Sequence, residues 1–249
     1  MFIDAHCHIS YYSNEKIKGI IDRARKENVV IIIENAVASN DFSKILDLAS
    51  KYPEIKAALG IYPIDALKLT LEELDKKINF IRENSSKIIA IGEVGLDLKW
   101  TKELDKEKQR FQKFIELALE IDKPIIVHSR QAEKEAVDML LANKIKKVVM
   151  HCFNNSKLIK KIVDAGWLFS IPTCVTFSKH FQELVDKVPI ENLLCETDSP
   201  YLHPEKGKRN NEPANVLASY EKIAEIKDLE LSVVEKKIQE NFEKLFGNV

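Results

Sequence analysis

The chain has 249 residues, of which 45% are hydrophobic and 31% are charged, a composition that supports a sizeable core and excludes intrinsic disorder. Lysine and arginine total 38, and aspartate and glutamate total 39, so the net charge is −1. This balance excludes a global positive field that would attract nucleic acid, and a polyanionic ligand would have to be held by local groups.

Short runs rich in β-branched residues alternate with amphipathic helical stretches, which is typical of an α/β protein with parallel strands. Most of these runs are apolar on both faces, as the strands of a parallel sheet between two layers are. The eight runs are Phe2–His6, Val29–Asn35, Ile55–Leu59, Ile88–Glu93, Pro124–His128, Val148–His151, Leu168–Ile171 and Leu193–Thr197.

Helical patterns fill most of the gaps between the runs, notably over Glu15–Glu27, Leu71–Glu83, Leu104–Ile121 and Ala132–Ala142. Thr70 with Glu73, and Ser232 with Glu235, have the spacing of a capping box at a helix start. The rest of the chain is expected to add a short helix over Lys179–Lys187, one starting near Pro213 after a long loop, and a final outer helix over Val233–Phe246.

Eight βα units in a chain of this length predict one (β/α)8 TIM barrel over residues 1–249, with a C-terminal helix on the outside. A doubly wound open sheet is the structural alternative. No G-x-G-x-x-G motif follows the first run, so a dinucleotide-binding fold has no support.

The N-terminal sequence MFIDAHCHIS lacks the basic start and long apolar run of a signal peptide, and no apolar stretch approaches the length of a membrane span. The four cysteines, Cys7, Cys152, Cys174 and Cys195, form no C-x-x-C pair and no secreted framework. We therefore expect a soluble, cytoplasmic protein with no membrane association and no obligate protein partner.

Residues of the type that bind metals stand at the ends of five of the expected strands. In a barrel enzyme the active site lies at the C-terminal ends of the strands. A random scatter of 6 histidines would seldom place four of them at those ends. The residues concerned are His6, His8, Glu93, His128, His151 and Asp198.

The spacing of His6 and His8 places both side chains on one face of the first strand, because residues two apart point the same way. The pair could hold one ion from inside the barrel, while Cys7 points toward the helix layer. Two incidental histidines near an N-terminus are the alternative.

Glu93 ends a strongly apolar run, where an unpaired carboxylate is costly to bury, and its two oxygens could bridge two ions. A salt-bridged glutamate is the alternative there.

His128 and His151 each close a buried strand. Singly, each could be a core histidine with its hydrogen bonds satisfied, but together they make a second pair of nitrogen ligands. Asp198 could contact a metal and accept a proton from its water, or it could cap the next turn.

Together these segments resemble the TatD family of metal-dependent deoxyribonucleases, within the amidohydrolase superfamily, and the resemblance spans nearly the whole chain. The matching pieces are Asp4–His8, Gly92–Asp97, Ile126–Arg130, His151–Phe153, Glu196–Leu202, Arg209–Asn210 and Glu212–Val216. The resemblance implies a TIM barrel and two divalent ions (zinc, magnesium or manganese) that activate a water to hydrolyse DNA phosphodiester bonds. It also implies that His6, His8, Glu93 and Asp198 hold one ion, and that Glu93, His128 and His151 hold the other.

In this scheme Glu93 bridges the two ions and Asp198 takes a proton from the water, so these are the expected catalytic residues. The family usually has a histidine where this chain has Tyr62, and Asn211 interrupts the usual Arg-Asn-Glu-Pro sequence. Neither departure removes a metal ligand; both bear on substrate preference.

The expected substrate contacts are of two kinds, and each has an ordinary structural alternative. Arg130, Arg209 and His203 are expected to contact phosphate, although each could be a surface cation. Tyr62 and Phe153 are expected to stack on an unpaired base, although they could simply cover the barrel mouth.

A net charge of −1 and a narrow barrel mouth predict action on DNA as an exonuclease at single-stranded ends, because a stiff duplex cannot lower an internal phosphate into such a pocket. The resemblance implies attack from the 3′ end. A small-molecule amidohydrolase acting on an ester, lactone, amide or phosphotriester is the alternative enzyme. A non-catalytic metal-dependent scaffold or sensor is a third possibility.

Overall fold

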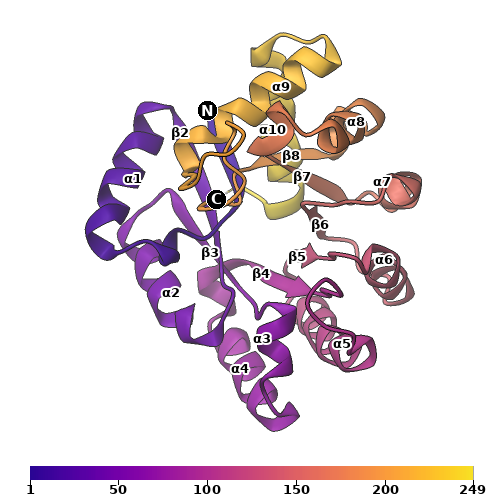
Figure 1. Ribbon diagram of the computed structural model, residues 1–249. Coiled ribbons are helices and arrows are strands. Elements are labelled where there is room, and N and C mark those ends of the chain that lie inside the picture. Colours follow the sequence, from indigo (N-terminus) through magenta and orange to yellow (C-terminus); the bar gives the residue numbers. More distant parts are fainter. Residues whose placement is uncertain (249) are drawn as a thin grey trace.

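A computed structural model describes residues 1–248 of the chain. Eight parallel strands form one sheet in the order of the sequence, and a ring of helices surrounds them (Figure 1). The strands are β1 Phe2–Cys7, β2 Val29–Asn35, β3 Ile55–Leu59, β4 Ile88–Gly95, β5 Ile125–His128, β6 Val148–His151, β7 Leu168–Pro172 and β8 Leu193–Glu196.

The sheet curls until its last strand returns beside its first. The Asp198 N–H donates to the His6 carbonyl at 2.9 Å, and the His8 N–H donates to the Ser199 carbonyl at 2.8 Å. These bonds join the ends of β1 and β8, so the expected (β/α)8 TIM barrel is confirmed. The eight expected strands agree with the structure to within two residues, the largest difference being that β4 continues past Glu93 to Gly95.

Helices follow the strands and cover them with their apolar faces. Each of the expected helices is present, although the helix near Pro213 starts with a 3-10 turn. The helices are α1 Asn14–Lys26, α2 Phe42–Lys51, α3 Pro63–Leu67, α4 Leu71–Glu83, α5 Leu104–Glu120, α6 Glu133–Ala142, α7 Ile159–Asp164, α8 Lys179–Lys187, α9 Leu217–Lys227 and α10 Leu231–Phe246.

One of the two expected capping boxes is present and the other is wrong. At α4 the Glu73 N–H donates to Thr70 Oγ1 at 3.2 Å, and the Thr70 N–H donates to Glu73 Oε2 at 2.8 Å. At α10 the helix begins at Leu231, so Ser232 lies inside the first turn. Glu235 instead contacts the N-terminal amine of Met1.

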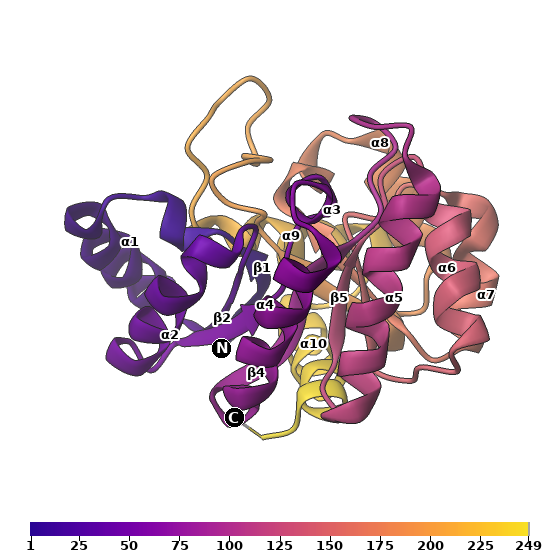
Figure 2. The same cartoon turned by 90° about the horizontal axis from the view of Figure 1, so that it is seen from below.

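The final helix is fastened to the barrel by a polar contact. The Asn241 amide donates to the Ile190 carbonyl at 2.7 Å and to the Leu193 carbonyl at 2.8 Å. Figure 2 shows both termini and α10 toward one end of the molecule, and the loop after β8 projecting from the opposite end. No described helix is both long and apolar enough to cross a membrane.

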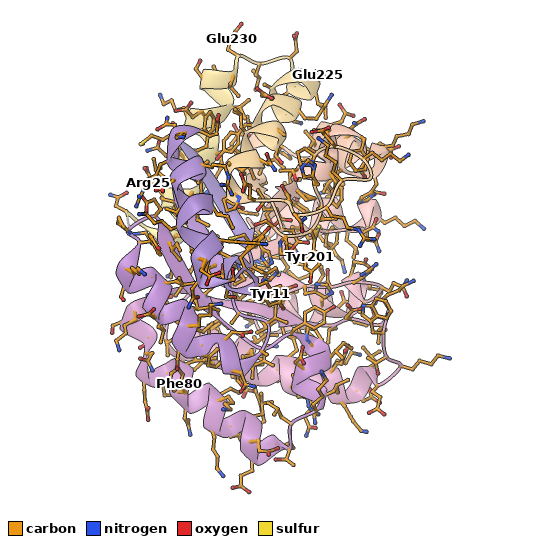
Figure 3. All side chains as sticks on the ribbon, turned by 60° about the vertical axis from the view of Figure 1, so that its left-hand side comes forward. Tyr11, Arg25, Phe80, Tyr201, Glu225 and Glu230 are labelled. Carbon is orange, nitrogen blue, oxygen red and sulfur yellow. The ribbon has the colours of Figure 1, made fainter. Side chains whose placement is uncertain are left out.

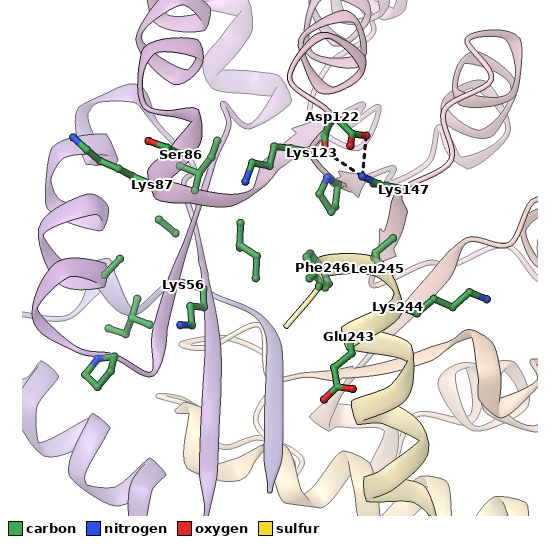
Figure 4. A pocket seen from close by; sticks show the side chains of 18 residues that line it. Lys56, Ser86, Lys87, Asp122, Lys123, Lys147, Glu243, Lys244, Leu245 and Phe246 are labelled. Carbon is green, nitrogen blue, oxygen red and sulfur yellow. Dashed lines mark hydrogen bonds and ion pairs between the residues drawn. The ribbon is translucent and has the colours of Figure 1, made fainter. Parts of the chain in front are cut away.

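A cavity of about 690 Å³ lies at the end of the barrel where the strands begin, between the starts of β3 to β5 and the end of α10 (Figure 4). Lysines line it, among them Lys56, Lys123 and Lys147, and Lys147 is paired with Asp122 at 2.8 Å. None of the expected metal ligands lines this cavity. They lie at the other end, where barrel enzymes carry their active sites.

Candidate metal centre

The barrel brings the six expected ligand side chains to one end of the strands. Donor atoms of five of them fall into compact groups, each within 4.8 Å: His6, Glu93 and His151 form one group, and His6, His8 and Asp198 form another. The sixth, His128, adjoins these groups through Glu93. His6 is fully buried and Glu93 is 3% exposed, so the cluster is shielded from bulk water.

Four donor atoms form a tight set around His6 and His8. Their Nε2 atoms lie 3.3 Å apart, and Glu93 Oε2 lies 3.7 Å from each. Asp198 Oδ1 is 3.4 Å from His8 Nε2 and 3.7 Å from His6 Nε2. A tetrahedral ion with bonds of about 2.0–2.2 Å separates its ligand atoms by about 3.3–3.6 Å. The nitrogen and carboxylate donors therefore fit a divalent cation in both chemistry and spacing.

In two of the histidines, the hydrogen bond at Nδ1 shows that Nε2 is the nitrogen that faces the cluster. His8 Nδ1 lies 2.9 Å from the Asn35 carbonyl, which can only accept, so Nδ1 carries the proton. His151 Nδ1 lies 2.8 Å from Glu196 Oε2, a carboxylate oxygen that also accepts. In the neutral rings both Nε2 lone pairs therefore face the cluster, as metal-binding histidines require.

Opposite charges around the cluster shift the pKa values of its groups. Burial acts to lower the pKa of His8, but the hydrogen bond and charge of Asp198, with the charge of Glu93, raise it to about 9. Burial acts to raise the pKa of Glu93, but the hydrogen bonds from His128 and His6 hold it well below its ordinary value. The Glu93 carboxylate is therefore ionised at neutral pH and can offer its negative charge to a cation.

His128 differs from the other histidines because both of its nitrogens face carboxylates. Nδ1 lies 2.8 Å from Glu93 Oε1, and Nε2 lies 3.0 Å from Asp97 Oδ2. Burial acts to lower the pKa of His128, but these two hydrogen bonds raise it to about 9. The Tyr62 hydroxyl donates to Asp97 and lies 3.4 Å from His128 Nε2.

Three further residues lie at the cluster that the sequence patterns did not indicate as ligands. Asp97 belongs to a family motif, but only the fold shows that it contacts His128. Strand alternation gives Glu196 the same face as Asp198, a signal that could have indicated its contact with His151. The Cys152 thiol lies in a third compact group, with His151 and Asp198, and no spacing pattern indicated this.

The expected substrate residues fall in different surroundings. Arg130 and Arg209 are exposed and His203 is half-buried, and no described carboxylate forms an ion pair with either arginine within 4.0 Å. The expectation for Phe153 is wrong: this ring is fully buried and packs edge-on against Phe169 at 5.6 Å, so no base can stack on it. Tyr62 is partly buried with its hydroxyl directed at Asp97.

An eight-stranded barrel with buried histidines and carboxylates clustered at the C-terminal ends of its strands has the architecture of metal-dependent hydrolases. Residues 3–247 match the family described as TatD related DNase, and the chain belongs to this family. It is therefore a metal-dependent hydrolase of the TatD family.

Relatives of similar length agree with this assignment. An uncharacterised metal-dependent hydrolase of Methanocaldococcus jannaschii is 38% identical over 247 residues, which cover 98% of this chain and 96% of that protein. The human deoxyribonuclease TATDN3 is 33% identical over 258 residues, with 98% and 94% covered. The crystal structure of the TatD homologue YJJV from Escherichia coli K12 shares the fold, with a TM-score of 0.93, 24% identity, and 100% and 98% covered.

Glu196→Gln is expected to weaken metal binding about 10- to 100-fold, because it removes the negative charge that orients and polarises the His151 ring. Gln preserves the volume of this buried side chain, so the fold should remain. Zinc affinity measured by competition with a chelating dye checks this. The exposed Glu183→Ala variant is the control, and equal affinities in both variants would show that Glu196 has no influence on the centre.

Proposed function

We propose that this protein is a divalent-metal-dependent deoxyribonuclease that hydrolyses phosphodiester bonds at unpaired DNA ends, acting from the 3′ end. The observation that carries the proposal is the set of four donor atoms at the barrel mouth: the Nε2 atoms of His6 and His8 lie 3.3 Å apart, and an oxygen of Glu93 and one of Asp198 each lie 3.4–3.7 Å from both nitrogens. Membership of a family described as TatD related DNase, and the name of the human relative, support DNA as the substrate.

We propose two divalent ions, zinc, magnesium or manganese, shared between two sets of ligands. Glu93 is proposed to bridge them, because its Oε2 faces His6 and His8 while its Oε1 faces His128 at 2.8 Å and His151 at 3.8 Å. When bound, such ions supply Lewis acidity, which lowers the pKa of water and offsets charge that develops on a phosphate.

Asp198 is proposed as the proton acceptor. Burial acts to raise its pKa, but the hydrogen bond to His8 and the charges of His151, His8 and His6 hold the pKa below its ordinary value. The carboxylate is therefore ionised at neutral pH and can take a proton. Its backbone lies in the left-handed region, with a φ of 53°.

The proposal of unpaired ends follows from the burial of the ligands and the nearly neutral charge of the chain. The ligands are buried, so a scissile phosphate must be lowered toward them, and a frayed end or single strand can do so. Few cations are needed to hold one or two phosphates. Arg130 follows β5, and His203 and Arg209 lie in the projecting loop after β8 (Figure 2), so these three are the proposed phosphate contacts.

The test compares a closed circular single strand with the same strand in linear form, beside a panel of simple esters and lactones. Digestion of the linear form alone, with mononucleotides released from the 3′ end, is the expected result. Equal cutting of both forms would establish endonuclease action instead. Hydrolysis of an ester or lactone with neither strand cut would show that the protein is a small-molecule hydrolase.

Asp198→Asn is expected to lower kcat on a linear single strand by about 10²- to 10⁴-fold, with a much smaller change in KM. Asparagine keeps the size and one coordinating oxygen and tolerates the left-handed backbone, but it cannot take the proton. Steady-state kinetics with the variant loaded with metal to the wild-type level check this. A raised KM with unchanged kcat would assign Asp198 to substrate binding.

A further inference from the structure

Trp100 is a large aromatic side chain that the fold leaves in solvent. It lies in the loop between β4 and α5 and is 66% exposed, whereas the other tryptophan, Trp167, is 1% exposed. Two cations flank it: Arg130 Cζ and Lys99 Nζ each lie 5.9 Å from the centre of the Trp100 ring. An exposed indole with two cations near its ring has the chemistry of a platform for unpaired bases.

The loop that carries Trp100 is fastened directly to the metal centre. The Lys99 N–H donates to Asp97 Oδ1 at 2.9 Å, and Asp97 Oδ2 contacts His128 at 3.0 Å. The Leu98 N–H donates to the Arg130 carbonyl at 3.0 Å, which joins this loop to the one after β5. Three residues span at most about 11 Å, so the Trp100 backbone lies within that distance of Asp97.

Two exposed tyrosines lie at the other side of the centre, against His8. The Tyr11 ring stacks on His8 with centroids 5.4 Å apart, and the Tyr201 ring meets His8 edge-on at 6.5 Å. They are 43% and 54% exposed, and Figure 3 shows the two close to each other near the middle of the view. Aromatic surface is thus available on both sides of the buried ligands.

We propose that Trp100, with Arg130 and Lys99 against it, is a stacking subsite for a base next to the scissile phosphate of an unpaired DNA strand. The stacking subsite rests on the proposed function, and it describes how the metal centre would hold a DNA strand. The strand would pass from the Tyr11 and Tyr201 rings, over the buried ligands, to Trp100. Stacking is sequence-tolerant because every base has an aromatic face, and it needs a base that is not paired.

Intrinsic fluorescence tests the subsite directly, because Trp167 is buried and only Trp100 can meet a ligand. Wild-type protein is titrated with a short oligothymidylate whose phosphorothioate linkages resist hydrolysis, and with an abasic strand of equal length and linkage. Quenching by the first strand alone is expected. Equal quenching by the abasic strand would overturn the proposal, because phosphate contact would then account for the signal; so would no quenching by either.

Binding affinities separate stacking from charge. Trp100→Ala is expected to weaken binding of the oligothymidylate about 5- to 100-fold, while Trp100→Phe keeps most of the affinity. The slope of log affinity against log salt should be unchanged by Trp100→Ala and should fall by about 0.7 in Arg130→Ala, which removes a phosphate contact. Leu119→Ala, a similarly exposed apolar side chain on α5, is the control and should bind as the wild type does.

Thermal unfolding of each variant confirms that it is folded, so a loss of affinity cannot be assigned to unfolding. Equal affinity in wild type and Trp100→Ala would overturn the stacking subsite even if linear single strands are digested, and the proposed function would then stand alone. Base-dependent quenching in a protein that digests no strand would support the subsite and overturn the nuclease proposal.

Discussion

Glu93→Ala is expected to lose at least one of the two proposed ions and nearly all hydrolytic activity, while the barrel stays folded. Glu93 contributes an oxygen to each ligand set, 3.7 Å from His6 and His8 on one side and 2.8 Å from His128 on the other. Without it, the set of His128 and His151 keeps no carboxylate, and the set of His6 and His8 keeps only Asp198. The ligands lie at the mouth, beyond the packed layers of the barrel, so the core is unchanged.

Metal content by mass spectrometry and turnover of a linear single strand are the two measurements for this variant. Glu183→Ala, which removes an exposed carboxylate from α8, is the control and should keep wild-type metal and turnover. If Glu93→Ala retained both ions with near-normal turnover, the bridging assignment would be wrong.

Gly95→Ala is expected to destabilise the protein by about 4 kcal/mol or more, a size reserved for severe steric conflicts. Gly95 has a φ of +144°, and a Cβ there would lie 1.9 Å from the His128 carbonyl oxygen. The two residues are paired across β4 and β5. A methyl group would push the strands apart at the point where they carry Glu93 and His128, so metal binding should fall with stability.

Urea denaturation of Gly95→Ala beside Gly166→Ala checks this expectation. Gly166 also has a positive φ, +74°, but its Cβ would meet nothing within 4 Å. The control therefore carries only the backbone cost of a left-handed alanine, about 1–2 kcal/mol. Similar destabilisation in both variants would show that the close approach at Gly95 has no special cost.

The barrel and its candidate ligands could be predicted because both follow from local patterns. Apolar runs such as Ile88–Glu93 mark buried parallel strands, and parallel strands bring their C-terminal ends to one place. A histidine or carboxylate at the end of a run therefore lies at the common mouth once the runs are placed.

Features that depend on single backbone angles or on distant partners were not predictable. Phe153 follows strand β6 and was expected at the mouth, but the structure buries it fully. The preceding residue, Cys152, has a φ of +46°, and no sequence pattern indicated this left-handed backbone. Asp97 gains its contact with His128 only when β5 is placed beside β4. Ser232 has the right spacing for a cap, but the helix starts at Leu231, two residues before the expected Val233.

Divalent ions at this cluster are proposed to make the protein hydrolyse DNA. The most direct test strips the protein with a chelator, restores zinc, magnesium or manganese stepwise, and measures bound metal together with mononucleotide release from a linear single strand. We expect no release from the stripped protein and a rate that rises with bound metal until two ions per chain are present. Undiminished DNA cleavage by the metal-free protein, or full metal loading with no strand cleaved, would contradict it.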